Sequence, residues 1–300
     1  MNKLIVFSLV SNTCVAEKVA KRLNAELGVV FFDYFADGEI LVKTLSDVKD
    51  KDVLIIESTA KKAHERLFEL LLLIDSIKRS GAKSIKLYIP YFGYSRQERV
   101  SWSNEPVSCE VVAKILDTAK VDEILTFDLH HKDIEKFFET KFENLPTTPL
   151  FVEYYKDYFK NNGISLDDVV VVSPDHGANL RADSLVQGLN GSKKVILNKY
   201  RPKPNFAEHL AVNNDEIKGK VCIIIDDIID TGGTIISATE VLLNGGAKKV
   251  LVGASHGVFS HGSLDKLLSS PIADIVVTNT IESKLSDKIN ILDITPLIKF

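Results

Sequence analysis

The sequence is poor in cysteine, carries little net charge and has no long uncharged apolar run. Its three cysteines are scattered and form no C-x-x-C pair, which argues against a disulfide framework or a thiolate zinc site and favours the reducing cytoplasm. The 37 Lys and Arg against 41 Asp and Glu give a net charge of −4, so we expect neither nucleic acid nor an anionic membrane as the main partner. The most apolar stretch, residues 67–78, contains Glu69 and Asp75, which argues against a membrane span.

Short β-branched runs alternate with amphipathic helical patterns along the chain. Continuous apolar runs indicate strands buried on both faces, and their alternation with helices favours a parallel sheet covered on both sides. The sequence therefore predicts a doubly wound α/β fold. The expected strands span residues 3–8, 52–58, 84–90, 123–128, 169–174, 220–226, 249–255 and 274–279, and the clearest expected helices span 63–80, 106–119 and 234–244.

The two halves of the chain resemble each other. Residues 51–92 and 219–259 each contain a lysine-bearing turn, an apolar strand, a helical stretch, a Gly-Ala-Lys turn and a second strand. Any two β-α-β units share some of these features, but an offset of about half the chain favours two similar domains over one large domain. We expect domains over residues 1–145 and 146–300, with the junction near the prolines of 143–151.

The strongest functional signal is the segment VCIIIDDIIDTGGTI at residues 221–235. An apolar strand ends in two adjacent carboxylates, and a glycine-containing loop then leads into a helical pattern. Glycines without Cβ let backbone N–H groups converge on a small anion at a helix N-terminus, where threonine hydroxyls add donors. The carboxylates can bind sugar hydroxyls directly or through Mg²⁺, so the segment predicts a site for a phosphorylated ribose rather than an ordinary turn with solvated acids. The candidate residues are Asp226, Asp227, Asp230, Thr231, Gly232, Gly233 and Thr234.

This segment resembles the ribose 5-phosphate loop that phosphoribosyltransferases share with ribose-phosphate pyrophosphokinases. Five further motifs are similar to those of the pyrophosphokinases and occur in the same order. They are FADGEI (35–40), PYFGYSRQER (90–99), FDLHH (127–131), VVSPDHG (171–177) and KYRPKPN (199–205). The sequence is therefore identified as a member of the pyrophosphokinase family over nearly its whole length, and the two phosphoribosyltransferase-like domains of that family agree with the internal repeat.

The resemblance implies transfer of the diphosphoryl group of ATP to the C1 hydroxyl of ribose 5-phosphate, which gives 5-phosphoribosyl 1-pyrophosphate and AMP. Such a transfer depends on cations around the phosphates more than on a covalent nucleophile, and Mg²⁺ is the expected cofactor. The N-terminal domain would then bind ATP and the C-terminal domain ribose 5-phosphate. The family also implies a homo-oligomer built from dimers and assembled into a hexamer.

Two polar segments carry the ATP site that the resemblance implies. The first offers an aromatic ring that can stack on adenine, followed by two carboxylates, and the second offers guanidinium and amide donors within four residues. Residue types alone would also fit an ordinary Asp-Gly turn and a solvated polar loop. The implied ATP-binding residues are Phe35, Asp37, Gly38, Glu39, Arg96, Gln97 and Arg99.

The resemblance assigns His130 to Mg²⁺ bound on the ATP phosphates, makes Lys199 the catalytic residue and places Arg201 on ribose 5-phosphate. Asp175, at the end of another expected strand, is a further candidate for Mg²⁺. A carboxylate is a hard oxygen ligand suited to Mg²⁺. The prolines after these cations disfavour a helix and predict a mobile, unpaired loop over 199–206. Cations on such a loop can neutralise charge on the transferring group, although the residues alone would favour a solvated basic loop.

The sequence departs from the family pattern at several places, two of which concern regulation. The family usually has basic residues after the SRQER motif, whereas residues 100–105 contain no Lys or Arg. The sequence also ends at Phe300, before the serine-containing tail that usually follows, and it has no glycine between residues 1 and 27. In many members the tail and the basic loop bind a regulatory phosphate or ADP. We therefore expect weak or absent activation by inorganic phosphate.

Two alternative functions compete with this interpretation. A phosphoribosyltransferase would consume the product, but it would have no use for the ATP-binding segments at 35–40 and 96–99. A catalytically silent, synthetase-like regulatory subunit would lack Lys199, Arg201, His130 or part of the sugar-phosphate loop, and all of them are present.

Overall fold

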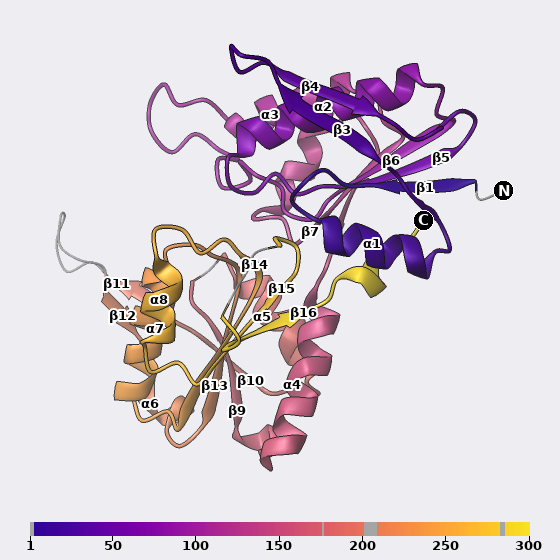
Figure 1. The fold of residues 1–300 in the computed structure, drawn as a ribbon. Helices are drawn as coiled ribbons and strands as arrows, with labels where there is room; N and C mark the ends of the chain where they lie inside the picture. Colours follow the sequence, from indigo (N-terminus) through magenta and orange to yellow (C-terminus); the bar gives the residue numbers. More distant parts are fainter. Residues whose placement is uncertain (1–2, 176, 201–208, 283–285) are drawn as a thin grey trace. The chain divides into compact units, whose positions relative to one another are not determined.

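The computed structural model describes residues 3–175, 177–200, 209–282 and 286–300. The chain forms two compact units (Figure 1). Unit 1 comprises residues 1–145, 280–282 and 294–300, and unit 2 comprises residues 146–279 and 283–293. The chain therefore returns to unit 1 twice near its C-terminal end, which no sequence feature indicated.

Unit 1 is built on a six-stranded sheet in the order β2-β1-β5-β6-β7-β8, and all its neighbouring strands are parallel. The strands are β1 (Leu4–Phe7), β2 (Glu26–Leu27), β5 (Asp52–Ile56), β6 (Ser84–Ile89), β7 (Glu123–Phe127) and β8 (Phe142–Leu145). The helices are α1 (Thr13–Arg22), α2 (Ala63–Arg79), α3 (Ser108–Thr118) and the 3-10 helices η1 (Lys132–Phe137) and η3 (Thr295–Leu297). A separate antiparallel hairpin of β3 (Val30–Tyr34) and β4 (Ile40–Thr44) packs on α2.

Unit 2 repeats this plan with the strand order β10-β9-β13-β14-β15-β16, again all parallel. The strands are β9 (Val169–Ser173), β10 (Lys193–Ile196), β13 (Val221–Ile229), β14 (Lys249–Gly257), β15 (Asp274–Thr278) and β16 (Ile289–Leu292), with a separate antiparallel hairpin of β11 (Asn198–Tyr200) and β12 (His209–Ala211). The helices are α4 (Thr148–Asn162), η2 (Leu166–Asp168), α5 (Asn179–Gly188), α6 (Asn214–Ile217), α7 (Gly233–Asn244) and α8 (Ser263–Leu268).

Apolar side chains on both faces of each sheet explain these layers. In unit 2, one core cluster joins the sheet to α7 and α8, and a second joins its other face to α4 and α5. In unit 1, α2 and α3 bury their apolar faces on the sheet; α2 does so through residues spaced three and four apart, from Leu67 to Ile77. The predicted doubly wound, parallel α/β fold is confirmed, and all eight predicted strands and all three predicted helices are present within a few residues. Within the described ranges, no helix combines the length and hydropathy that a membrane crossing needs.

The internal repeat is visible in the backbone hydrogen bonds. In each unit, the lysine after the Gly-Ala turn donates its backbone N–H, at 2.8 Å, to the carbonyl of the lysine that precedes the central strand. Those two acceptor residues are Lys51 and Lys220. The glycines of the two Gly-Ala turns have φ values of +85° and +93°, a conformation that favours glycine. Counting six residues from each lysine places Glu57 of unit 1 at the position of Asp226 in unit 2.

Candidate active site

Residues 230–234, which we call the sugar-phosphate loop, connect β13 to the start of α7 in unit 2. Gly232 precedes the helix with φ +76°, and its carbonyl accepts the first helical bond from Ile236 N at 2.9 Å. A Cβ on Gly232 would lie 3.0 Å from Leu267 Cγ, whereas a Cβ on Gly233 would meet nothing within 4 Å. The hydroxyl of Ser263 donates to the Asp230 carbonyl at 2.6 Å and anchors the loop. The loop therefore combines a tight left-handed turn with an open helix N-terminus, a geometry that is suited to binding an anion.

The acid pair before this loop concentrates negative charge in a protected place. Asp227 is buried and Asp226 is partly buried near the end of β13, and Asp227 N donates to Asp226 Oδ1 at 2.9 Å. Burial, and next the charge of Asp227, raise the pKa of Asp226 well above its ordinary value. Such a pair is stabilised by hydroxyl donors or by a divalent cation, which is the chemistry that a ribose site requires.

Arg181 is a functional candidate that the sequence reasoning missed. It lies in the first turn of α5, and its Nη2 atom is 3.5 Å from Asp227 Oδ2. Both side chains are largely buried, at 16% and 5% exposure, so their attraction is weakly screened by solvent. Its signal in the sequence was a single arginine six residues after Asp175, which fits an ordinary helix surface equally well.

Asp175 belongs to the same edge of the unit 2 sheet as the acid pair, because β9 and β13 are neighbouring parallel strands. Its Oδ1 atom accepts hydrogen bonds from Gly177 N at 2.9 Å and Ala178 N at 3.1 Å, and Ser173 Oγ donates to its carbonyl at 2.6 Å. The carboxylate thus has a fixed orientation at the end of β9. In the described parts of the chain, no group of three or more His, Cys, Asp or Glu side chains could hold a metal ion by itself.

His130 follows β7 in unit 1 and is exposed. Two contacts fix the backbone before it: Asp128 N donates to the Leu145 carbonyl at 3.1 Å, and Leu129 N donates to Asn144 Oδ1 at 3.0 Å. Asp128 has φ +39°, so the chain turns sharply as it leaves the strand. Because β6 and β7 are neighbouring parallel strands, this turn and the segment after β6 leave the sheet at the same edge.

In the SRQER segment after β6, the two arginines are exposed, and the glutamine is held in place by hydrogen bonds. Gln97 N donates to the Tyr94 carbonyl at 2.9 Å, and Gln97 Oε1 accepts the Ser108 hydroxyl at 2.7 Å at the start of α3. Arg96 is exposed, and Arg99 is exposed beside Glu98, with Nε 3.5 Å from Oε1. The segment thus presents two guanidinium groups to solvent from a structured turn.

The FADGEI segment forms the turn of the β3–β4 hairpin. Phe35 N donates to the Glu39 carbonyl at 2.8 Å, Glu39 N donates to Asp37 Oδ1 at 3.1 Å, and Gly38 has φ +92°. The ring of Phe35 is 54% exposed, as stacking on a base would require. Gly38 and Glu39 also line a cavity of about 640 Å³ against α2.

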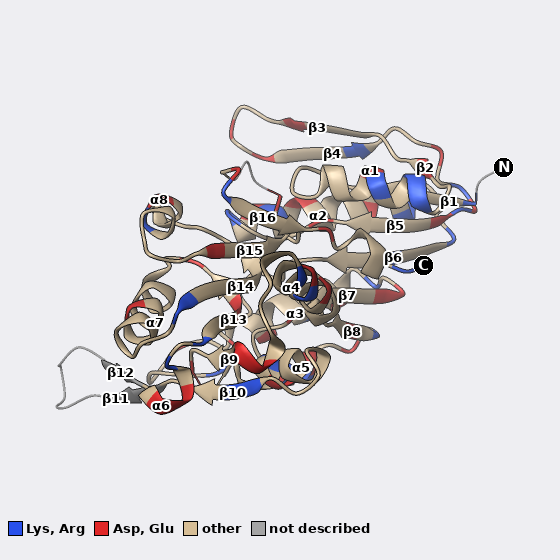
Figure 2. Cartoon of the chain, turned by 90° about the horizontal axis from the view of Figure 1, so that it is seen from below, with Lys and Arg blue, Asp and Glu red and all other residues tan. Residues whose placement is uncertain are grey.

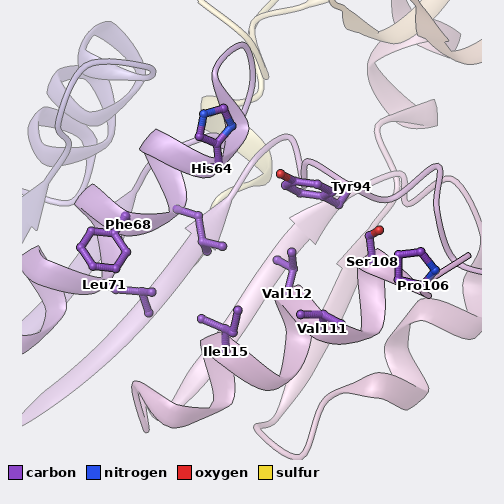
Figure 3. Close-up of a pocket in the computed structure, with 10 residues that line it drawn as sticks. His64, Phe68, Leu71, Tyr94, Pro106, Ser108, Val111, Val112 and Ile115 are labelled. Atoms are coloured by element: carbon purple, nitrogen blue, oxygen red, sulfur yellow. The ribbon is translucent and has the colours of Figure 1, made fainter.

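The hairpin is held to α2 by a buried carboxylate. Tyr34 Oη donates to Glu69 Oε1 at 3.3 Å, and Arg66 forms an ion pair with the same carboxylate. Glu69 is fully buried, and burial raises its pKa while Arg66 opposes the rise. The same part of α2 also lines an apolar cavity of about 420 Å³, which Figure 3 shows between side chains of α2 and α3, among them Phe68 and Ile115.

The predicted basic loop is only partly described. Residues 198–200 form β11 and pair with β12, with Lys199 opposite Leu210. The expectation of an unpaired segment is therefore wrong at Lys199, because the prolines begin only after this strand. Arg201 and the rest of the predicted mobile loop lie outside the described residues. Elsewhere, Figure 2 shows Lys and Arg interspersed with Asp and Glu within each unit.

Comparison with known proteins assigns the family. Residues 4–119 match the family model of the N-terminal domain of ribose phosphate pyrophosphokinase, and residues 169–299 match the phosphoribosyl synthetase-associated domain. The chain is 42% identical to the ribose-phosphate pyrophosphokinase of Halalkalibacterium halodurans over 98% of its length and 92% of that protein. It is 40% identical to that of Corynebacterium ammoniagenes over 99% and 92%. The crystal structure of phosphoribosylpyrophosphate synthetase from Mycobacterium smegmatis matches with a TM-score of 0.89 and 33% identity, over 99% of this chain and 96% of that one. The chain belongs to the ribose-phosphate pyrophosphokinase family.

Proposed function

We propose that the protein transfers the diphosphoryl group of ATP to the C1 hydroxyl of ribose 5-phosphate and releases AMP. The observation that carries this proposal is the glycine turn at the N-terminus of α7, directly after a buried acid pair. The N–H groups of the turn and the hydroxyls of Thr231 and Thr234 donate to the sugar phosphate, while Asp226 and Asp227 bind the ribose hydroxyls. This arrangement orients the C1 hydroxyl for attack on the β-phosphorus of ATP.

On the ATP side, we propose that the exposed turn of the hairpin contacts adenine through Phe35 and the ribose through its carboxylates. Arg96, Gln97 and Arg99 then bind the phosphates, since guanidinium groups match phosphate oxygens in pairs. Lys199 places its ammonium on the transferring group, where it stabilises the charge that develops in the transition state.

Mg²⁺ is the cofactor in this proposal, and the donors fit it. Mg²⁺ retains several waters and usually binds through one or two carboxylates together with substrate phosphates. We propose that the oriented carboxylate of Asp175 in unit 2 and the exposed imidazole of His130 in unit 1 are each Mg²⁺-binding groups of their own unit. When bound, the ion neutralises the polyphosphate charge, which lowers the barrier to phosphoryl transfer.

The direct test is AMP release from ATP, Mg²⁺ and ribose 5-phosphate, followed by ³¹P NMR of the second product. We expect stoichiometric AMP and 5-phosphoribosyl 1-pyrophosphate, and no AMP without the sugar phosphate. A parallel reaction with 5-phosphoribosyl 1-pyrophosphate and nucleobases tests the phosphoribosyltransferase alternative. Nucleotide formation there, or no AMP under varied metals and phosphate concentrations, would overturn the assignment.

We also propose that the protein acts in the cytoplasm, where ATP and ribose 5-phosphate are metabolites.

We propose further that the protein is a homo-oligomer built from dimers into a hexamer. The support for an oligomer is a concentration of exposed apolar side chains on the β3–β4 hairpin and on the groove of α2 and α3. These side chains are Val29, Phe31, Tyr34, Phe35, Leu41, Leu45, Phe68, Val111 and Ile115. Light scattering after size-exclusion chromatography measures the assembly, and a monomer at all concentrations would contradict the proposal.

A further inference from the structure

The chain directly after β5 is polar, yet it lies in the interior of unit 1. Glu57, Ser58 and Thr59 are 0%, 0% and 3% exposed. By the internal repeat, Glu57 and Ser58 occupy the positions that Asp226 and Asp227 occupy in unit 2. Buried polar groups are retained where they make specific hydrogen bonds, so the partners of these three side chains indicate their role.

Glu57 holds the loop between β1 and α1. Its Oε2 atom accepts hydrogen bonds from Ser8 Oγ and Leu9 N, both at 2.9 Å, and its Oε1 atom accepts from Ser11 N at 2.9 Å and Val10 N at 3.4 Å. Three successive backbone N–H groups thus converge on one carboxylate. Such convergence is how a backbone nest binds an anion, and here the chain supplies the anion itself.

Ser58 connects this loop to the segment after β6. Its backbone N–H donates to Asn12 Oδ1 at 2.7 Å, its hydroxyl donates to the Thr280 carbonyl at 2.6 Å, and the same hydroxyl accepts Tyr91 N at 2.9 Å. Asn12 Nδ2 also donates to the Thr280 carbonyl at 3.1 Å. The returning residue Thr280 therefore locks Ser58 in the orientation that receives Tyr91.

Thr59 completes the connection. Its N–H donates to the Tyr91 carbonyl at 3.0 Å, and its hydroxyl accepts Gly93 N at 2.7 Å. A Cβ on Gly93 would lie 2.5 Å from the Thr59 carbonyl oxygen, so only glycine permits this close approach. The chain continues into Tyr94, whose carbonyl accepts Gln97 N, and the fixed backbone at 91–93 thereby sets where Arg96 and Gln97 lie.

We propose that Glu57, Ser58 and Thr59 are positioning residues for the ATP-binding segment 94–97, with Glu57 acting as a built-in anion for the nest at residues 9–11. The inference rests on the proposed function, in which Arg96 and Gln97 bind ATP. Ser58 and Thr59 fix the backbone of the segment directly. Glu57 acts one step further away, because it orders the loop that ends at Asn12, the partner of Ser58.

The first experiment replaces Thr59 with Val, which keeps the shape but leaves Gly93 N without its acceptor. We expect ATP binding, measured by calorimetry, to weaken by about tenfold or more because a small displacement of binding groups has a large effect. Binding of ribose 5-phosphate should stay within about twofold, since unit 2 carries that site. Thr59→Ser retains the hydroxyl and should restore ATP binding.

Thr239→Val is the matched control. Thr239 is also fully buried and donates its hydroxyl to a backbone carbonyl, Ile235 O at 2.8 Å, but it lies in unit 2. We expect it to lower the melting temperature without weakening ATP binding. Unchanged ATP binding in Thr59→Val, or equal weakening of both substrates, would overturn the inference. Intact ATP binding without AMP release in the wild type would instead refute only the proposed function.

The second experiment tests the built-in anion by chemical rescue. Glu57→Ala removes the carboxylate and leaves space at the nest, so ATP binding should weaken and added formate should restore part of it. Glu57→Gln fills the space with an amide and should not respond to formate. Sodium chloride at the same ionic strength controls for screening. Equal responses of the wild type and Glu57→Ala to formate would overturn the role of Glu57.

Discussion

The sugar-phosphate loop allows strain and binding to be tested with two adjacent glycines. Gly232 has φ +76°, and an added Cβ would lie 3.0 Å from Leu267 Cγ, whereas a Cβ on Gly233 has open space. We expect Gly232→Ala to destabilise unit 2 and to displace the phosphate donors of the loop. Gly233→Ala is the matched control for backbone strain in the stability measurement, because it adds the same methyl group to the neighbouring residue, which has open space around it.

The expected magnitudes follow from the backbone. A residue with a Cβ in the left-handed conformation lowers the free energy of unfolding by about 1–2 kcal/mol relative to glycine. The contact with Leu267 can be relieved by a shift of that side chain. For a unit of this size, such a loss lowers the melting temperature by roughly 3–8 °C. Gly233→Ala should leave it unchanged or raise it by about 1–3 °C, because alanine restricts the unfolded chain.

Scanning calorimetry and steady-state kinetics for both substrates provide the readouts. Gly232→Ala should raise the KM for ribose 5-phosphate by about tenfold or more and leave the KM for ATP within about twofold. Equal melting temperatures for the two variants would show that the left-handed turn is not strained by a side chain. Equal increases in the KM values of Gly232→Ala for ribose 5-phosphate and for ATP would show that the loop does not bind the sugar phosphate.

Three further predictions concern charge. Lys199→Ala should lower kcat by roughly 10²–10³ and leave ATP affinity within a few-fold, because its contact matters mainly in the transition state; a loss below about tenfold would make it a surface residue. Since the folded-state pKa of Asp226 is raised, stability falls as pH rises from the ordinary carboxyl range towards that raised value. Asp226→Asn should therefore raise the melting temperature by about 2–6 °C near neutral pH, but not in acid. The same change should weaken the binding of ribose 5-phosphate. Because residues 100–105 contain no Lys or Arg, a phosphate titration from zero should show no strong activation, and saturating ATP should relieve inhibition by ADP.

The sequence predicted the central strands well because they are buried on both faces. Missed strands lie at sheet edges or in hairpins, where runs are short or polar: β2 has two residues and β8 reads FENL. The two returns of the chain to unit 1 were also missed. One of them depends on hydrogen bonds of Ser58 and Asn12 to Thr280, which are separated by more than two hundred residues and leave no periodic pattern in the sequence.

Candidate site residues that share one short segment can be proposed from the sequence, whereas candidates that depend on distant partners cannot. The acid pair, the glycines and the threonines of the sugar-phosphate loop lie within nine residues of one another, so their chemistry can be inferred from spacing. The role of Arg181 depends on its pairing with Asp227 across two elements. The role of Glu57 depends on backbone N–H groups 46 to 48 residues away.

The repeat places an acid at the same strand position in both units, but with different hydrogen-bond partners. In both units, the central strand lies beside a parallel strand whose following loop donates backbone N–H groups to a carboxylate. In unit 2 that loop contains its own acid, Asp175, which accepts the N–H groups of residues 177 and 178. The corresponding loop of unit 1, residues 8–12, reads SLVSN and contains no acid. Its N–H groups engage Glu57, whereas in unit 2 Asp227 of the corresponding acid pair lies 3.5 Å from Arg181 Nη2. The two loops thus differ in the carboxylate that accepts their backbone N–H groups, which is Asp175 of the loop itself in unit 2 and Glu57 of the central strand's end in unit 1.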